Sequence, residues 1–106
     1  MRIIPNSKNL NETDKKKFLE YLEEKMQRIK PFMEAHYPDP DTVKAACRIQ
    51  RHERHNAYEI TFDITAPRGG KFNTKVVKHN INEAMDLAVD KLEDQVREHF
   101  KILTRS

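Results

Sequence analysis

Apolar residues in the last quarter of the chain recur at steps of three and four. Over residues 80–103 they are Ile81, Met85, Ala88, Leu92, Val96, Phe100 and Leu103. This spacing places them on one face of an α-helix, and no glycine or proline interrupts the run. Asn80 and Glu83 form a capping-box-like start, because each side chain can satisfy a backbone N–H of the first turn. The pattern predicts one long amphipathic helix.

A second helical pattern lies near the N-terminus. Residues 11–14 (NETD) supply N-cap chemistry. The apolar stripe that follows consists of Phe18, Leu22, Met26, Ile29 and Met33. Because proline lacks a backbone N–H and clashes with the preceding turn, we expect Pro31 to end or kink this helix near Lys30. Residues 34–41 (EAHYPDPD) are expected to form a loop.

Between the two helices, apolar and polar residues alternate with the period of a β-strand. Three strands are predicted, at residues 42–51, 58–65 and 72–77, and their inward positions include Cys47, Phe62 and Thr74. Residues 52–56 (HERHN) form the polar tip of the first hairpin, and residues 67–70 (PRGG) are a turn signal. A short strand is predicted at residues 2–4, where Pro5 confines it to a strand end or an edge.

The predicted order is β-α-β-β-β-α. Hairpin links make the last three strands an antiparallel meander, and two helices with one apolar face each must then cover a single side of the sheet. The expected fold class is therefore α+β, a two-layer sandwich of a mainly antiparallel sheet with both helices on one face. A length of 106 residues fits one domain.

The composition narrows the classes of function. Twenty basic and 17 acidic residues give a net charge of +3, which permits a polyanionic partner without requiring one. No apolar run is long enough to cross a bilayer, and the N-terminus lacks an apolar run of signal-peptide length, so we expect a cytoplasmic protein. The single Cys47 fits a reducing compartment and, in its alternating pattern, the role of a small core residue.

Neither metal chemistry nor catalysis finds support in the sequence. His52 and His55 lie close together, but Arg54 sits beside them, no cysteine joins them, and a strand tip lacks fixed ligand geometry. The acids and bases form no nucleophile–base pair, and Gly69-Gly70 stands at a hairpin turn rather than before a helix. We expect no enzyme, no metal and no cofactor.

Basic residues follow a more informative pattern. One flank of the first helix's stripe carries cations and aromatics, interrupted only by Glu24: Lys17, Tyr21, Lys25, Arg28 and Phe32. Such a flank suits phosphate contact with base or ribose packing. The last helix places Lys91, Arg97, Lys101 and Arg105 outward among acids, and the strands and turns add Lys44, Arg48, Lys75, Lys78, Arg68 and Lys71. This set favours RNA as a partner.

Three segments resemble the ribosome hibernation-promoting factor and ribosome-associated inhibitor A family, in its short, single-domain form. They are residues 7–10 (SKNL) with the helix FLEYLEEKMQRI, residues 58–62 (YEITF), and, most specific, Ala84-Met85-Asp86 with residues 90–96 (DKLEDQV). The resemblance spans nearly the whole chain. It implies that residues 1–106 are a single ribosome-binding domain.

The resemblance also implies a function and a site. Such a protein binds the small ribosomal subunit in the cleft for tRNA and mRNA, and silences ribosomes under stress or in stationary phase. Its basic side chains would neutralise 16S rRNA phosphates while the domain blocks the channel. No membrane or small-molecule substrate is implied, and we expect a monomer off the ribosome. By position, Lys25 and Lys91 match best; charge and placement add Arg28, Lys75, Lys78, Arg97 and Lys101.

The chain also departs from the family pattern. Asn80 and Asn82 stand where the family usually has an acid and, after a spacer, a tyrosine, which removes an aromatic contact. The chain stops at Ser106 without a second domain, so we expect any role in ribosome dimers to need another factor.

Two alternatives stay open. One is a generic double-stranded RNA-binding module, which would contact two successive minor grooves. The other is a protein-interaction domain using the outer sheet face, where Arg48, Glu59, Asp63 and Lys75 are mixed in sign. Binding through the outer face to a protein should depend little on salt, whereas rRNA binding weakens steeply as salt rises.

Overall fold

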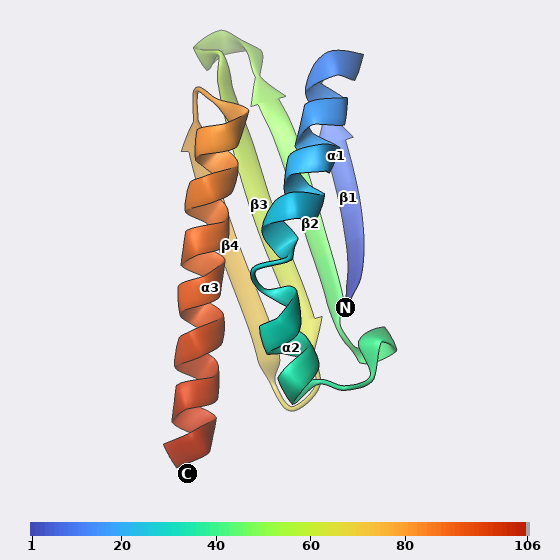
Figure 1. Ribbon diagram of the computed structural model, residues 1–106. Coiled ribbons are helices and arrows are strands. Elements are labelled where there is room, and N and C mark those ends of the chain that lie inside the picture. Colours follow the sequence, from blue (N-terminus) through green and yellow to red (C-terminus); the bar gives the residue numbers. More distant parts are fainter. Residues whose placement is uncertain (106) are drawn as a thin grey trace.

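The apolar stripes of the helices pack against one face of a four-stranded sheet in the computed structural model, which describes residues 1–105 (Figure 1). In chain order the main elements are β1 (Arg2–Lys8), α1 (Glu12–Met26), α2 (Lys30–His36), β2 (Lys44–His52), β3 (Ala57–Ala66), β4 (Gly70–Lys78) and α3 (Ile81–Arg105). Short 3-10 turns, η1 (Pro40–Thr42) and η2 (Glu53–His55), precede and follow β2. The predicted α+β class is confirmed.

The strands lie in the order β1-β2-β3-β4. β2, β3 and β4 are antiparallel neighbours, as the hairpins predicted, whereas β1 pairs in parallel with β2, with Ile3 opposite Ala45. A parallel pair needs a crossover connection, and α1 with α2 forms it. This crossover lays α1 beside α3 on the same face of the sheet (Figure 1).

The strand β1 extends beyond the predicted residues 2–4. It runs from Arg2 to Lys8 and contains Pro5, which lies opposite Cys47. The predicted end at residue 4 is wrong, but the edge position that was expected for a strand with Pro5 is confirmed, because β1 is the first strand of the sheet. The Arg2 N–H donates to the Val43 carbonyl at 2.8 Å, and N–H groups alternate in direction along a strand. The nitrogen of Pro5 therefore faces away from β2, on the free edge, where no ladder hydrogen bond is lost.

The break in the first helical segment also has a different cause from the predicted one. α1 ends at Met26, and residues 27–29 form a turn before α2 begins at Lys30, with Pro31 in its first turn. Proline suits that position because the N–H it lacks would have no partner there. Pro31 therefore starts a helix rather than ending one, and residues 34–36, predicted as loop, are helical.

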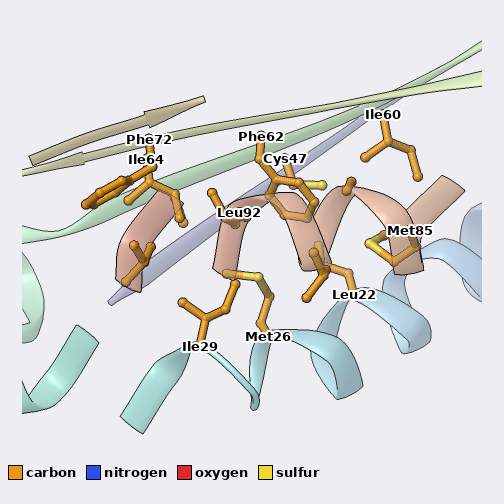
Figure 2. Packing of buried hydrophobic residues seen from close by; sticks show 14 of the residues in the cluster. Leu22, Met26, Ile29, Cys47, Ile60, Phe62, Ile64, Phe72, Met85 and Leu92 are labelled. Atoms are coloured by element: carbon orange, nitrogen blue, oxygen red, sulfur yellow. The ribbon is translucent and has the colours of Figure 1, made fainter. Parts of the chain in front are cut away.

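The core lies between the sheet and the helices (Figure 2). The predicted stripe stays buried across the break, at Phe18, Leu22, Met26, Ile29 and Met33. The inward strand positions Cys47, Phe62 and Thr74 are buried too, and burial raises the pKa of the Cys47 thiol, in keeping with a core role. The side chains of Leu103 and Arg105 lie outside the described ones. No helix in residues 1–105 is long and apolar enough to cross a membrane.

Candidate nucleic-acid interface

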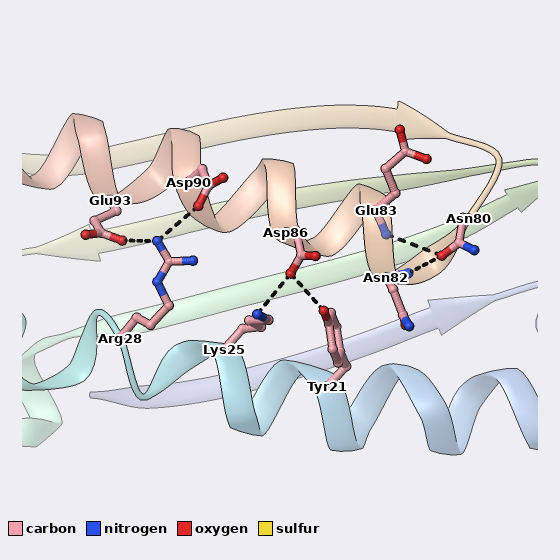
Figure 3. Close-up of polar contacts among 9 residues, drawn as sticks. All are labelled: Tyr21, Lys25, Arg28, Asn80, Asn82, Glu83, Asp86, Asp90 and Glu93. Atoms are coloured by element: carbon pink, nitrogen blue, oxygen red, sulfur yellow. Dashed lines mark hydrogen bonds and ion pairs between the residues drawn. The ribbon is translucent and has the colours of Figure 1, made fainter.

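The predicted basic flank of the first helix faces acids of α3. We call this contact the α1–α3 seam, and all of its residues except Arg97 are drawn in Figure 3. The seam consists of Tyr21, Lys25, Arg28, Asp86, Asp90, Glu93 and Arg97. Lys25 Nζ lies 3.1 Å from Asp86 Oδ1, and the Tyr21 hydroxyl donates to the same oxygen at 2.8 Å. The ammonium of Lys25 also lies 5.1 Å from the centre of the Tyr21 ring.

Arg28 makes the second contact of the seam. Its guanidinium lies 3.0 Å from Asp90 Oδ1 and also pairs with Glu93 Oε2. The other oxygen of Glu93 pairs with Arg97, four residues on, at 2.7 Å. Cations and carboxylates therefore alternate along the seam, and they neutralise much of the positive field that the sequence assigned to this flank.

The contacts of the seam shift the pKa values of Lys25 and Asp86. Pairing with Asp86 raises the pKa of Lys25. Partial burial alone would raise the pKa of Asp86, but the hydrogen bond from Tyr21 and the pairing with Lys25 outweigh burial and place it below its usual value. Both groups therefore keep their charges near neutral pH.

The seam should contribute to stability in a pH-dependent way. A carboxyl whose pKa is lower in the folded protein stabilises above its unfolded pKa, about 3.9 for aspartate, and that contribution disappears as pH falls through the folded pKa. Chemical unfolding of the wild type and Asp86→Asn should therefore differ at pH 7 and converge toward pH 3. A difference that stays constant over this range would show that the charge of Asp86 contributes nothing.

The seven predicted RNA-binding residues do not form one patch. Lys25, Arg28 and Arg97 meet in the seam, and Lys78 lies 4.0 Å from Glu83 at the start of α3. Lys91 projects from the flank of α3 nearer β4, one turn before Gln95, whose side chain hydrogen-bonds the Asn73 backbone.

Lys75 and Lys101 lie apart from the seam. Lys75 is on the opposite side of the sheet from the helices, since its neighbours Thr74 and Val76 are buried, and its Nζ is 3.3 Å from Glu59. Lys101 is exposed near the C-terminal end of α3. The predicted residues thus occupy both faces of the protein.

The sequence carries a signal for the acidic half of the seam. Asp86, Asp90 and Glu93 follow one another at steps of four and three, so they share one flank of α3. Tyr21, Lys25 and Arg28 repeat the same steps on the first helical segment. Two such flanks are complementary in charge, and they can form cross-helix ion pairs once the helices pack side by side.

The start of α3 confirms half of the predicted capping box. The Asn80 side-chain oxygen accepts from the backbone N–H groups of Asn82 at 2.8 Å and Glu83 at 3.3 Å (Figure 3). The Glu83 carboxylate lies instead near Lys78. The Asn82 Oδ1 atom is buried and has no hydrogen-bond partner within the described part of the chain.

The hairpin tip that carries His52 and His55 forms the short turn η2. His52 Nε2 lies 3.6 Å from Glu59 Oε1 on the adjacent strand β3. Over residues 1–105, no three side chains of His, Cys, Asp or Glu come together in a way that could hold a metal ion.

Comparison with known proteins identifies the family. No curated protein matches the chain. A ribosomal subunit interface protein from Coxiella burnetii has the same fold, with a TM-score of 0.70 and 18% identity over 95% of this chain and 99% of the other. The N-terminal domain of Thermus thermophilus Protein Y gives a TM-score of 0.68 and 25% identity, over 93% and 99%.

The family model described as sigma 54 modulation protein / S30EA ribosomal protein matches residues 5–103. That range contains all three segments on which the resemblance to hibernation-promoting factors rested, and the resemblance is confirmed. The chain therefore belongs to the sigma 54 modulation protein / S30EA ribosomal protein family.

Proposed function

We propose that this protein binds the small ribosomal subunit in the cleft through which tRNA and mRNA pass, and inhibits translation by occupying it. The observation that carries this proposal is the family match over residues 5–103, which covers part of β1, all of the other strands, α1, α2 and nearly all of α3. The chemical requirement is modest, because steric exclusion needs only a folded body and an attraction to rRNA. The protein would act in the cytoplasm, as a monomer, without a cofactor.

The shape of the domain suits this role. Its principal extents are 47 × 22 × 19 Å, an elongated body with cations on both faces. A body of this kind can contact rRNA on two sides of a channel. Each phosphate that a lysine or arginine neutralises releases counterions, and this release drives binding.

The proposed contacts differ in how available their charges are. Lys91 and Lys101 are exposed, and neither forms an ion pair with another described side chain. Lys25, Arg28, Lys75, Lys78 and Arg97 each lie near a carboxylate. A cation beside a carboxylate attracts phosphate less strongly, so we propose Lys91 and Lys101 as the stronger contacts on α3.

Sedimentation through a sucrose gradient with purified ribosomal subunits tests the function. We expect the protein to travel with the small subunit at low salt and to dissociate as salt rises, with a logarithmic slope of roughly 0.7 to 0.9 per phosphate contacted. Absence from the small-subunit fraction at low salt would overturn the proposal.

The same gradient tests the contacts on α3. Lys91→Glu combined with Lys101→Glu should lower the bound fraction and the salt slope while thermal unfolding stays near that of the wild type, because both side chains are exposed. A free RNA duplex that binds the protein as tightly as small subunits do would favour the double-stranded RNA-binding module instead. Binding whose strength does not change with salt concentration would favour a protein partner.

A further inference from the structure

The sheet has one face without helices, and this face carries a positive charge that the seam lacks (Figure 1). Strand residues whose neighbours are buried point to this side, which we call the open sheet face. Its cations are Arg2, Lys8, Lys44, Arg48, Lys71 and Lys75, all exposed. Its acids are Glu59 and Asp63.

Both acids of the open sheet face are engaged locally. Glu59 lies 3.3 Å from Lys75 and 3.6 Å from His52, and Asp63 accepts a hydrogen bond from the Asn73 side chain at 2.7 Å. The helices differ from the open sheet face in net charge, because acids outnumber bases on them. α1 holds five acids and four bases, and α3 holds six acids and four bases. The net charge of +3 is therefore unevenly distributed: the open sheet face is positive, and the helix layer carries more acids than bases.

The strand register orders five of these cations into two rows, and Lys8 lies beyond the second row. Arg2 lies beside Lys44, and Thr65 separates Lys44 from Lys71, which makes one row across all four strands. Four residues further along the strands, Thr61 separates Arg48 from Lys75 in the second row. At about 3.3 Å per residue the rows are ~13 Å apart. Between them a shallow hollow lies over Ala46, where the side chain is short.

The side chains on the open sheet face indicate which class of partner can bind there. Its strands carry no outward Phe, Tyr or Trp within residues 1–105, so it offers no platform for stacking bases. Its large exposed apolar residues, Ile4 and Val77, lie on opposite edge strands and form no continuous patch for a protein or a membrane. Two cationic rows along a shallow hollow fit the phosphates of an RNA backbone.

We propose that the open sheet face is a second RNA-binding surface, which contacts the phosphate backbone of rRNA while the helix layer faces the other side of the cleft. This inference rests on the proposed function, and it identifies which surface supplies most of the electrostatic attraction. It also assigns Lys75 to a surface separate from that of Lys25 and Arg28.

Two charge-matched variants test the inference. Lys44→Glu with Arg48→Glu changes the open sheet face, and Lys15→Glu with Lys16→Glu makes the same change on exposed positions of α1. Each lowers the net charge by four, from +3 to −1. We expect the sheet variant to bind purified small subunits about tenfold or more weakly and to lose about two units of salt slope. The α1 variant should stay within about threefold of the wild type, since it leaves the proposed contacts intact.

The outcomes separate this inference from the function on which it rests. Failure of the wild type to bind would overturn the function itself. Equal binding by the two variants, with a wild type that binds, would overturn the inference alone. A sheet variant that loses the subunit but binds protein-free 16S rRNA like the wild type would place a ribosomal protein on this face and overturn the RNA assignment. Thermal unfolding checks the fold, and Lys44→Thr with Arg48→Thr keeps β-propensity should the reversal unfold the sheet.

Discussion

Gly70→Ala is expected to lower the free energy of unfolding by about 1–3 kcal/mol, the usual cost of an overpacked site. Gly70 is buried at the start of β4, and an added Cβ would lie 2.6 Å from the Tyr37 hydroxyl oxygen and 3.0 Å from the Ala66 Cβ. Tyr37 is itself buried against Phe100, so its ring has little room to move. Chemical denaturation measures the loss, which should lower the midpoint of thermal unfolding by several degrees.

A second substitution identifies the clashing atom. The Tyr37 hydroxyl is buried and has no hydrogen-bond partner among the described residues, so Tyr37→Phe alone should be neutral or stabilising. In that background Gly70→Ala should cost less, and the difference appears as a coupling energy of about 0.5 kcal/mol or more. Additive effects would show that the hydroxyl is not the obstacle.

The neighbouring Gly69 supplies the control. Its φ is +77° in the turn between β3 and β4, and an added Cβ would meet nothing within 4 Å. Gly69→Ala should therefore cost about 1–2 kcal/mol through backbone strain alone. That cost should be the same with Tyr37 or with phenylalanine at position 37.

The second large effect is expected for Arg28→Glu, which puts a carboxylate against Asp90 and Glu93 in the seam. The arginine side chain is 43% exposed, so each lost pair is screened and contributes only ~0.2–1 kcal/mol. With the new repulsion, the total loss should be roughly 1–2 kcal/mol. Denaturation at low salt measures it, and 1 M salt should shrink it, since the Debye length then falls to about 3 Å.

A compensating variant distinguishes charge from packing. Arg28→Glu combined with Asp90→Arg restores an opposite pair and should recover part of the lost stability. No recovery would show that the packing of the arginine stem, rather than its charge, holds the contact.

Loss of ribosome binding by Lys25→Glu with Arg28→Glu does not by itself identify an RNA contact, because both changes also disturb the seam.

The sequence predicted the helices and strands whose apolar residues recur with a regular period. α3 and the strands β2 to β4 follow directly from apolar spacing, because one face of each packs on the core. The length of β1 did not follow, since Pro5 is acceptable in a strand only if its nitrogen faces the free edge. That orientation depends on which side of β1 meets β2, and only the tertiary pairing determines it.

The site was predictable in part. The alternation of Phe72, Thr74 and Val76 already placed Lys75 on the side of the sheet away from the helices, so the split of the predicted cations over two faces was available from the sequence. The ion pairs of the seam were not, because Tyr21 and Asp86 are 65 residues apart and meet only when both helices pack on the sheet. Spacing indicated two complementary flanks, and packing decided that they face each other.

The position of Pro5 has a consequence for association between copies of the domain. The free edge of β1 offers backbone donors at Ile3 and Ser7, but the donor that would stand between them is missing. A strand from another molecule that tried to extend the sheet there would leave one of its carbonyls without a partner. Proline thus discourages sheet extension and aggregation along the edge that the parallel pairing leaves exposed.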